Sequence, residues 1–262
     1  MTSGPSLDGD KLLVFPRTMF GTTYVYDVET EDGDPVRLLE VEGVFESASY
    51  TDERRFEPTF EYYRAFDHLF EAFSAPNRVL MIGGGACAYP KHFVASQPHG
   101  AMDVVEIDPV IIRIARKHFF VDELMERFRT RETGRLNLIC AEGRGYLDEA
   151  ACEGKRYEVI INDSFSGGEA TSSLVDDAGL AAVKKCLKPK GLYLINVICD
   201  IEDDARDILE VVCALRRRCE FVHVIPCPDE VFGGVDNNLV IASDGDYEFS
   251  ACLPLPDDDL FA

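Results

Sequence analysis

The chain is poor in basic residues and lacks apolar runs of membrane-spanning length. Its 262 residues include 26 Lys and Arg but 48 Asp and Glu, which leaves a formal net charge of −22. Attraction to a polyanion requires clustered Lys and Arg, so nucleic acids and anionic membranes are not expected partners. The segment Met1–Ser6 lacks the basic and apolar regions of an export signal, and we therefore expect a cytoplasmic protein. The acidic surface either steers a cationic substrate or serves only solubility.

Paired cysteines and clustered histidines are also missing. None of the nine cysteines belongs to a C-x-x-C pair, their number is odd, and the five histidines are dispersed. This pattern predicts reduced, mostly buried thiols and no metal site. Cys87 lies just after a run of glycines, so its thiol is either packed or reactive.

A glycine-rich turn between two apolar runs is the most informative motif. Residues 78–89 read RVLMIGGGACAY, in which Val79–Ile82 is typical of a buried parallel strand. The glycines at 83, 84 and 85 allow a tight turn close to a ligand. A second apolar run, Met102–Val105, ends in Glu106. An acid at the tip of the second strand of a βαβ unit can accept hydrogen bonds from both ribose hydroxyls.

Three glycines between a strand and a helix often form only a tight connection. Here the order of strand, turn, helix, strand and acid favours a nucleotide site. Ala86, Ala88 and Pro90 stand where a dinucleotide fingerprint requires further glycines and a regular helix start. The motif therefore predicts a nucleoside ligand without a diphosphate.

Two later apolar runs are also followed by acids. Leu136–Cys140 precedes Glu142, and Tyr157–Ile161 precedes Asp163 and Ser164. Ligands of open α/β sheets bind beyond the carboxyl ends of the strands, so the residues that follow these strands should meet at one edge. These residues are Gly83, Glu106, Glu142 and Asp163. Residues 164–173 are rich in Ser, Gly and Thr and form either a substrate lid or a surface connection.

The apolar pattern divides the chain into four parts. Residues 1–10 are predicted to be disordered, 11–56 to form a small β domain with strands over 22–29 and 36–41, 57–250 to form the nucleoside-binding domain, and 251–262 to form an acidic tail. An amphipathic helix is predicted over 57–73, with Tyr62 off its aromatic core stripe. Further helices are predicted over 176–187 and 206–217, and further strands over 192–197, 221–225 and 238–242.

The motifs VLMIGGG, VVEIDP, AEGRGYL, YEVIINDSFSGG and LKPKGLYLINVI resemble the class I S-adenosylmethionine-dependent methyltransferase fold, and within it the spermidine synthase-like branch of polyamine aminopropyltransferases. The resemblance covers roughly residues 11–242. It implies an α/β fold with a doubly wound, mostly parallel seven-stranded sheet of Rossmann type and a small N-terminal antiparallel sheet. It also implies a transferase that uses S-adenosylmethionine or its decarboxylated form, without a metal ion, and a small-molecule amine as partner. A homodimer is the oligomer to test.

The resemblance also implies a role for each matching residue. Gly83, Gly84 and Gly85 would line the amino-acid or aminopropyl part of the nucleotide, Glu106 would hold the ribose, Ile107 would pack on the adenine, and Glu142 would receive the adenine amino group. Asp163 would accept the proton of the attacking amine, with Tyr62 beside it. The expected substrate contacts are Glu46, His68 and Ser164.

Two positions depart from the family pattern. Ala86 stands where the family has an aspartate that binds the aminopropyl ammonium of the decarboxylated donor, and Glu46 stands where it usually has glutamine. Three hypotheses follow. The chain is a spermidine synthase-like aminopropyltransferase, a small-molecule methyltransferase that tolerates Ala86, or a non-catalytic binding protein on a degenerate transferase fold.

Overall fold

A computed structural model of the chain describes residues 12–166, 169–170, 172–201, 204–229, 231–232 and 237–255. Three predicted segments lie wholly or partly outside these residues. They are the N-terminus (1–10), predicted to be disordered, Gly167 and Gly168 of the segment 164–173, and the end of the acidic tail (256–262). Among the helices in the described ranges, none is long and apolar enough to cross a membrane.

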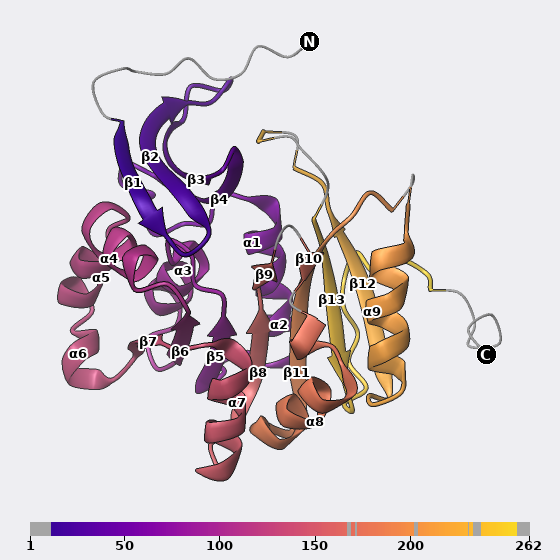
Figure 1. Ribbon diagram of the computed structural model, residues 1–262. Coiled ribbons are helices and arrows are strands. Elements are labelled where there is room, and N and C mark those ends of the chain that lie inside the picture. Colours follow the sequence, from indigo (N-terminus) through magenta and orange to yellow (C-terminus); the bar gives the residue numbers. More distant parts are fainter. Residues whose placement is uncertain are drawn as a thin grey trace.

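The centre of the molecule is a seven-stranded sheet with the order β12-β13-β11-β8-β5-β6-β7 (Figure 1). Its strands are β5 (Arg78–Ile82), β6 (Ala101–Glu106), β7 (Leu136–Cys140), β8 (Tyr157–Asn162), β11 (Leu187–Ile198), β12 (Phe221–Cys227) and β13 (Asn237–Ser243). Only β13 is antiparallel to its neighbours; the other adjacent pairs are parallel. The predicted doubly wound, mostly parallel sheet is therefore confirmed.

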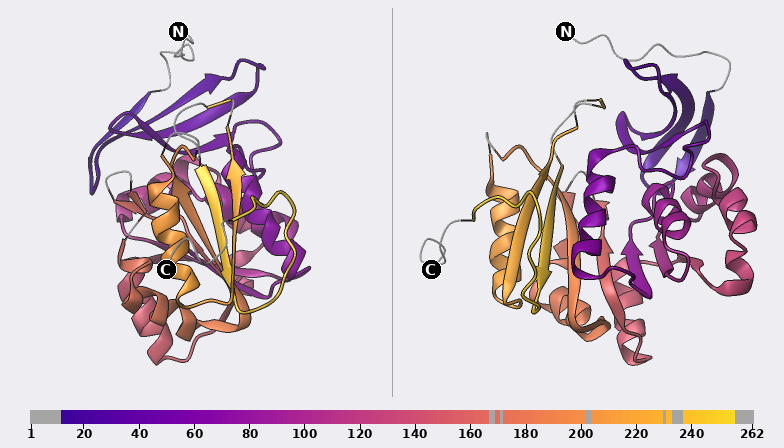
Figure 2. Two further views of the ribbon diagram at one scale, coloured as in Figure 1. Left: turned by 90° about the vertical axis from the view of Figure 1, so that its right-hand side faces the viewer. Right: turned by 180° about the vertical axis from the view of Figure 1, so that it is seen from behind.

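Helices cover both faces of this sheet (Figure 2). They are α3 (Ala88–Ser96), α4 (Pro109–His118), α5 (Val121–Arg127), α6 (Thr130–Thr133), α7 (Gly143–Cys152), α8 (Asp177–Cys186) and α9 (Arg206–Arg216). Alternate residues of β5 pack into two separate cores, with Val79 and Met81 on one face and Leu80 and Ile82 on the other. The short apolar runs are thus strands buried on both faces.

A separate antiparallel sheet lies beyond the carboxyl ends of the parallel strands (Figures 1 and 2). It consists of β1 (Leu13–Thr18), β2 (Gly21–Glu29), β3 (Pro35–Val41) and β4 (Val44–Tyr50). The sequence pattern predicts β2 and β3 but not β1 and β4. A buried contact fixes this sheet to the helices that cover the large one, since Nζ of Lys91 in α3 donates to Ser49 Oγ of β4 at 2.6 Å and to the carbonyl of Phe119, just after α4, at 2.9 Å.

The helix predicted over 57–73 is shorter and is interrupted. It consists of α1 (Glu61–Ala65), a 3₁₀ turn η1 (Phe66–His68) and α2 (Leu69–Ala72). Pro58 disfavours helical backbone at the preceding residue, and Phe60 is extended, so the helix starts later than the apolar period suggests. The helix predicted over 176–187 is α8, and the Asp176 carboxylate accepts a hydrogen bond from the Gly179 N–H at 2.6 Å.

The segment predicted to be a lid or a connection contains regular structure. Phe165–Ser166 (β9) and Glu169–Ala170 (β10) pair as a short antiparallel ribbon, and Ser172–Leu174 forms a 3₁₀ turn, η2. The ribbon directly follows Asp163 at the tip of β8.

Candidate functional site

The strand register brings the predicted site residues to one edge of the sheet. Ile82 lies opposite Val105 in β6 and opposite Asn162 in β8, and Glu106 lies opposite Cys140 in β7. The four predicted residues lie at these strand ends or within two residues of them, and so leave the sheet along one edge. They are Gly83, Glu106, Glu142 and Asp163.

The first glycine of the turn is required by its neighbours. Gly83 has φ +85°, and a Cβ atom there would lie 2.2 Å from the Asp163 carbonyl oxygen. A Cβ on Gly84 would lie 2.6 Å from Val104 Cγ1. The glycine loop is therefore pressed against the backbone that carries Asp163, and no larger residue fits between them.

Glu106 is held by the glycine loop. One oxygen, Oε2, accepts hydrogen bonds from the Gly84 and Gly85 N–H groups at 3.2 and 3.1 Å, and Oε1 accepts one from the Asp108 N–H at 2.9 Å. Burial raises the pKa of Glu106, while these backbone donors oppose the rise. Both lone pairs of Oε2 are thus taken by the glycine N–H groups, whereas Oε1 keeps one lone pair for a further donor.

Asp163 is half-buried and receives a hydrogen bond from Nδ2 of Asn196 to its Oδ1 at 2.9 Å. Burial raises the pKa of Asp163 to about 8, and repulsion from Glu46 and Glu106 adds to the rise. A carboxyl group with a pKa near neutrality is suited to accept and release a proton.

Glu46 reaches the site from the small sheet. In the pairing of β3 with β4, Leu39 lies opposite Ser47 and Glu40 opposite Phe45, so Glu46 is the extra residue of a β-bulge. Bulges redirect side chains and are frequent beside active sites. Averaged over all its atoms, Glu46 is exposed. Its carboxyl group is nevertheless partly shielded from water, and this desolvation raises the pKa of Glu46, with repulsion from Glu106 as the second cause.

Glu46, Glu106 and Asp163 thus form a carboxyl cluster. No Lys or Arg in the described part of the chain forms an ion pair with any of the three, and the ionised side chains that perturb their pKa values are all acidic. Such a cluster is complementary to a cation.

Two tyrosines of α1 lie beside this cluster. Tyr62 and Tyr63 are buried, with ring centroids 4.2 Å apart, and the Tyr63 hydroxyl lies 3.2 Å from Ser47 Oγ. Burial, followed by the charge of Asp163, raises both tyrosine pKa values, so both hydroxyls stay protonated. Tyr63 belongs to the aromatic stripe, and nothing in the sequence distinguishes it from a core residue.

Of three other predicted residues, two have side-chain hydrogen bonds within the protein. The Glu142 carboxylate caps α7 by accepting from the Arg144 and Gly145 N–H groups at 2.8 and 2.7 Å. Ser164 donates its hydroxyl to Asn162 at 2.6 Å. Ile107 is half-buried at the tip of β6. Their proposed ligand contacts stay predictions.

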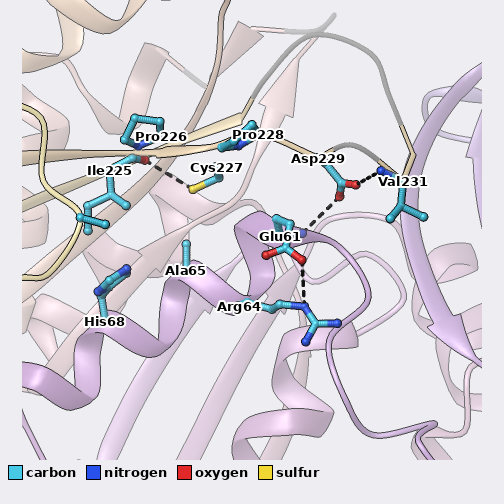
Figure 3. A pocket seen from close by; sticks show the side chains of 11 residues that line it. Glu61, Arg64, Ala65, His68, Ile225, Pro226, Cys227, Pro228, Asp229 and Val231 are labelled. Carbon is cyan, nitrogen blue, oxygen red and sulfur yellow. Dashed lines mark hydrogen bonds and ion pairs between the residues drawn. The ribbon is translucent and has the colours of Figure 1, made fainter.

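His68 lies apart from the carboxyl cluster. It lines a surface pocket of about 570 Å³ between α1 and the end of β12, together with Glu61, Arg64, Asp229 and Val231 (Figure 3). Its Nδ1 lies 3.1 Å from a Glu71 oxygen. None of the three clustered carboxyls lines this pocket. The structure therefore does not bring His68 to Asp163.

Cys87 is packed. It is buried, and this burial raises the pKa of its thiol to about 12, so the thiol stays protonated at neutral pH. Among the described residues, no group of three or more His, Cys, Asp or Glu side chains is arranged to hold a metal ion.

The sheet order and the site beyond its strand ends define a Rossmann-like protein of the class I methyltransferase fold. The family model of the spermine/spermidine synthase domain matches residues 59–222, and the chain belongs to this family. A probable spermidine synthase from Corynebacterium glutamicum superposes with a TM-score of 0.70 at 20% identity, over 90% of this chain and 81% of that one.

Curated relatives include both kinds of transferase. A polyamine aminopropyltransferase of Vibrio vulnificus (strain CMCP6) is 30% identical over 121 residues, which cover 46% of this chain and 38% of that protein. An eEF1A lysine and N-terminal methyltransferase homolog of Drosophila pseudoobscura pseudoobscura is 21% identical over 168 residues, which cover 58% of this chain and 23% of that protein. The chain thus spans well under half the length of these relatives.

Proposed function

We propose that the chain is a transferase that moves an aminopropyl group from decarboxylated S-adenosylmethionine to a small amine. The carboxyl cluster carries this proposal. Three carboxyl groups without a basic partner in the described structure fit a donor with a positive sulfonium and ammonium, and an acceptor that is itself a cation. The glycine loop and Glu106 supply a nucleoside cradle beside them.

In this reaction the protein deprotonates the amine, orients it and holds both reactants in line. The bound donor supplies an electrophilic carbon next to a sulfonium. Asp163 accepts a proton from the amine, whose lone pair forms the new C–N bond while the C–S bond breaks and its electron pair goes to sulfur. The nearby Tyr62 and Tyr63 hydroxyls remain protonated and orient the amine. The remaining rate enhancement comes from holding both reactants in line.

Electrostatics favour the donor that lacks a carboxylate. The parent S-adenosylmethionine brings a fourth negative group toward Glu46, Glu106 and Asp163, and like charges at short range disfavour binding. Methyl transfer is the second candidate, because Ala86 is fully buried against Val25 and Leu39 and the glycine loop offers no carboxylate for an aminopropyl ammonium. The methyltransferase relative agrees with this alternative.

Calorimetry with decarboxylated S-adenosylmethionine, S-adenosylmethionine and methylthioadenosine tests the proposal. We expect the decarboxylated compound to bind tightest, and Glu46→Gln to reduce that preference. Glu42→Gln removes one charge from the turn of the same hairpin and is the matched control, with the preference unchanged. Tighter binding of the parent compound favours methyl transfer, and binding of none of the three supports a non-catalytic protein.

A further inference from the structure

A single amide interrupts the apolar strand β11. This strand is parallel to β8, with Ile195 opposite Asn162, so Asn196 lies beside Asp163 at the same edge. The side chain of Asn196 is 2% exposed, and its neighbours Ile195 and Val197 are buried. Packing alone calls for an aliphatic residue at this position.

Only half of this amide has a hydrogen-bond partner in the described structure. Nδ2 donates to Asp163 Oδ1 at 2.9 Å, whereas Oδ1 of Asn196 is buried without a partner among the described residues. An ionised carboxylate only accepts hydrogen bonds, so the amide presents its Nδ2 to the ionised form of Asp163. A buried acceptor without a partner destabilises the folded state, so Asn196 is not explained by stability.

The groups around Asp163 oppose its ionisation. Glu46 faces it from β4, Glu106 from β6, and the Tyr62 and Tyr63 rings from α1. Burial and the two carboxylates raise the pKa of Asp163, while the hydrogen bond from Asn196 lowers it. Asn196 therefore stabilises the form of Asp163 that can take up a proton.

Resting on the function proposed above, we infer that Asn196 is a positioning residue, which favours the ionised form of the Asp163 carboxyl group and orients it toward the acceptor amine. The amide touches neither reactant and acts through Asp163. The inference separates Asn196 from a core residue that happens to lie nearby, because the two roles respond differently to substitution.

Asn196→Leu tests this inference. We expect the titration of the Asp163 carboxyl, followed by carbon-13 NMR, to move up by about one to two pH units, the value of one hydrogen bond to an ion. The acid limb of kcat/KM should move by the same amount, so that activity lost near neutral pH returns in alkaline buffer. The melting temperature should change little, since the orphan acceptor of Asn196 is removed while Asp163 Oδ1 loses its donor. If the leucine variant does not fold, Asn196→Ala gives the same titration and pH profile, with a lower melting temperature because it leaves a cavity.

Asn238 provides the matched control on the adjacent strand β13. It is 1% exposed, and its Nδ2 donates to the Cys199 carbonyl at 2.9 Å, away from Asp163. Asn238→Leu should lower the melting temperature and leave the Asp163 titration in place. An unchanged titration in Asn196→Leu overturns the inference. A wild-type protein that transfers nothing to any amine overturns the proposed function instead, and the NMR titration still decides the role of Asn196.

Discussion

The site carboxylates are fixed by backbone and amide donors before any ligand arrives. Glu106 is held by three N–H groups, and Asp163 by one amide. The hydrogen bonds orient the groups, while burial and mutual repulsion oppose their negative charge. A cationic ligand relieves that repulsion, so binding and electrostatic relief are coupled.

At Glu106 we expect Glu106→Ala to weaken the binding of adenosine compounds at least tenfold, because one charge-assisted hydrogen bond is worth about 1.5 to 3 kcal/mol. Isothermal calorimetry with methylthioadenosine measures this change. Glu158 is a matched control, since it is 8% exposed at the opposite end of β8 and contacts the Arg78 N–H and Lys188. Glu158→Ala should lower stability only. Full affinity in a folded Glu106→Ala protein contradicts the ribose assignment.

Asp163→Asn should abolish transfer, because loss of a general base costs about 100-fold to 10,000-fold in rate, while nucleoside affinity stays. The same variant has a pH-dependent effect on stability. The pKa of Asp163 is raised to about 8 in the folded state, so its contribution is full below the unfolded value near pH 4 and is lost as pH rises toward 8. Relative to wild type, Asp163→Asn should therefore gain stability from pH 4 to 8 and level off above.

Urea unfolding of both proteins at pH 5, 7 and 9 checks this sign. Asp163 instead acts as a structural cap if the asparagine variant is equally destabilised at all three values.

The sequence predicts well those helices and strands that have a hydrophobic periodicity or a short apolar run. The strands β5, β6 and β8 are found where the apolar runs place them, because each is short and buried on both faces, whereas β11 starts at Leu187, five residues before its predicted start. The strand β4 was missed, since its first residues are exposed and it carries Ser47 and Ser49. Its bulge, which directs Glu46, depends on pairing with β3 and has no local sequence signal.

The same limit applies within the site. Gly83, Glu106 and Asp163 follow strand tips and could be predicted as neighbours from the order of the elements. Tyr63 could not, because an aromatic at helical spacing is indistinguishable from core. Asn196 had a weak signal, a single amide in the apolar run LYLINVI, but its partner depends on the register of β11 with β8.

The connection from β5 to α3 gives a prediction at this scale. Gly83 and Gly33 have nearly the same φ, +85° and +83°, but nothing lies within 4 Å of a Cβ on Gly33. Gly33→Ala should therefore cost only left-handed strain, about 1 to 2 kcal/mol. Gly83→Ala adds a clash with the Asp163 backbone and should destabilise the fold by more and displace the carboxylate. Chemical unfolding and turnover measure both, and equal losses in the two variants contradict the close packing of loop and strand.

Over the whole molecule, the small sheet is fixed above the carboxyl ends of the large one. The buried Lys91 joins α3 to Ser49 of β4, and the Met19 N–H at the β1–β2 turn donates to Asp108 at 2.5 Å. These contacts hold Glu46 over the strand tips that carry Glu106 and Asp163. The cluster therefore exists only when both sheets are in place.

The chain that carries this cluster has a net charge of −22. The electric field of the whole protein should therefore concentrate a cationic acceptor near the cluster. We expect kcat/KM for a diamine to fall several-fold between about 20 and 300 mM salt, because the Debye length shrinks from roughly 20 Å to under 8 Å. Binding of uncharged methylthioadenosine, measured over the same range, is the control and should change little. Salt should also raise the melting temperature, since it screens the self-repulsion of the surface. If the diamine and the neutral nucleoside respond alike, the acidic surface serves solubility and does not steer the substrate.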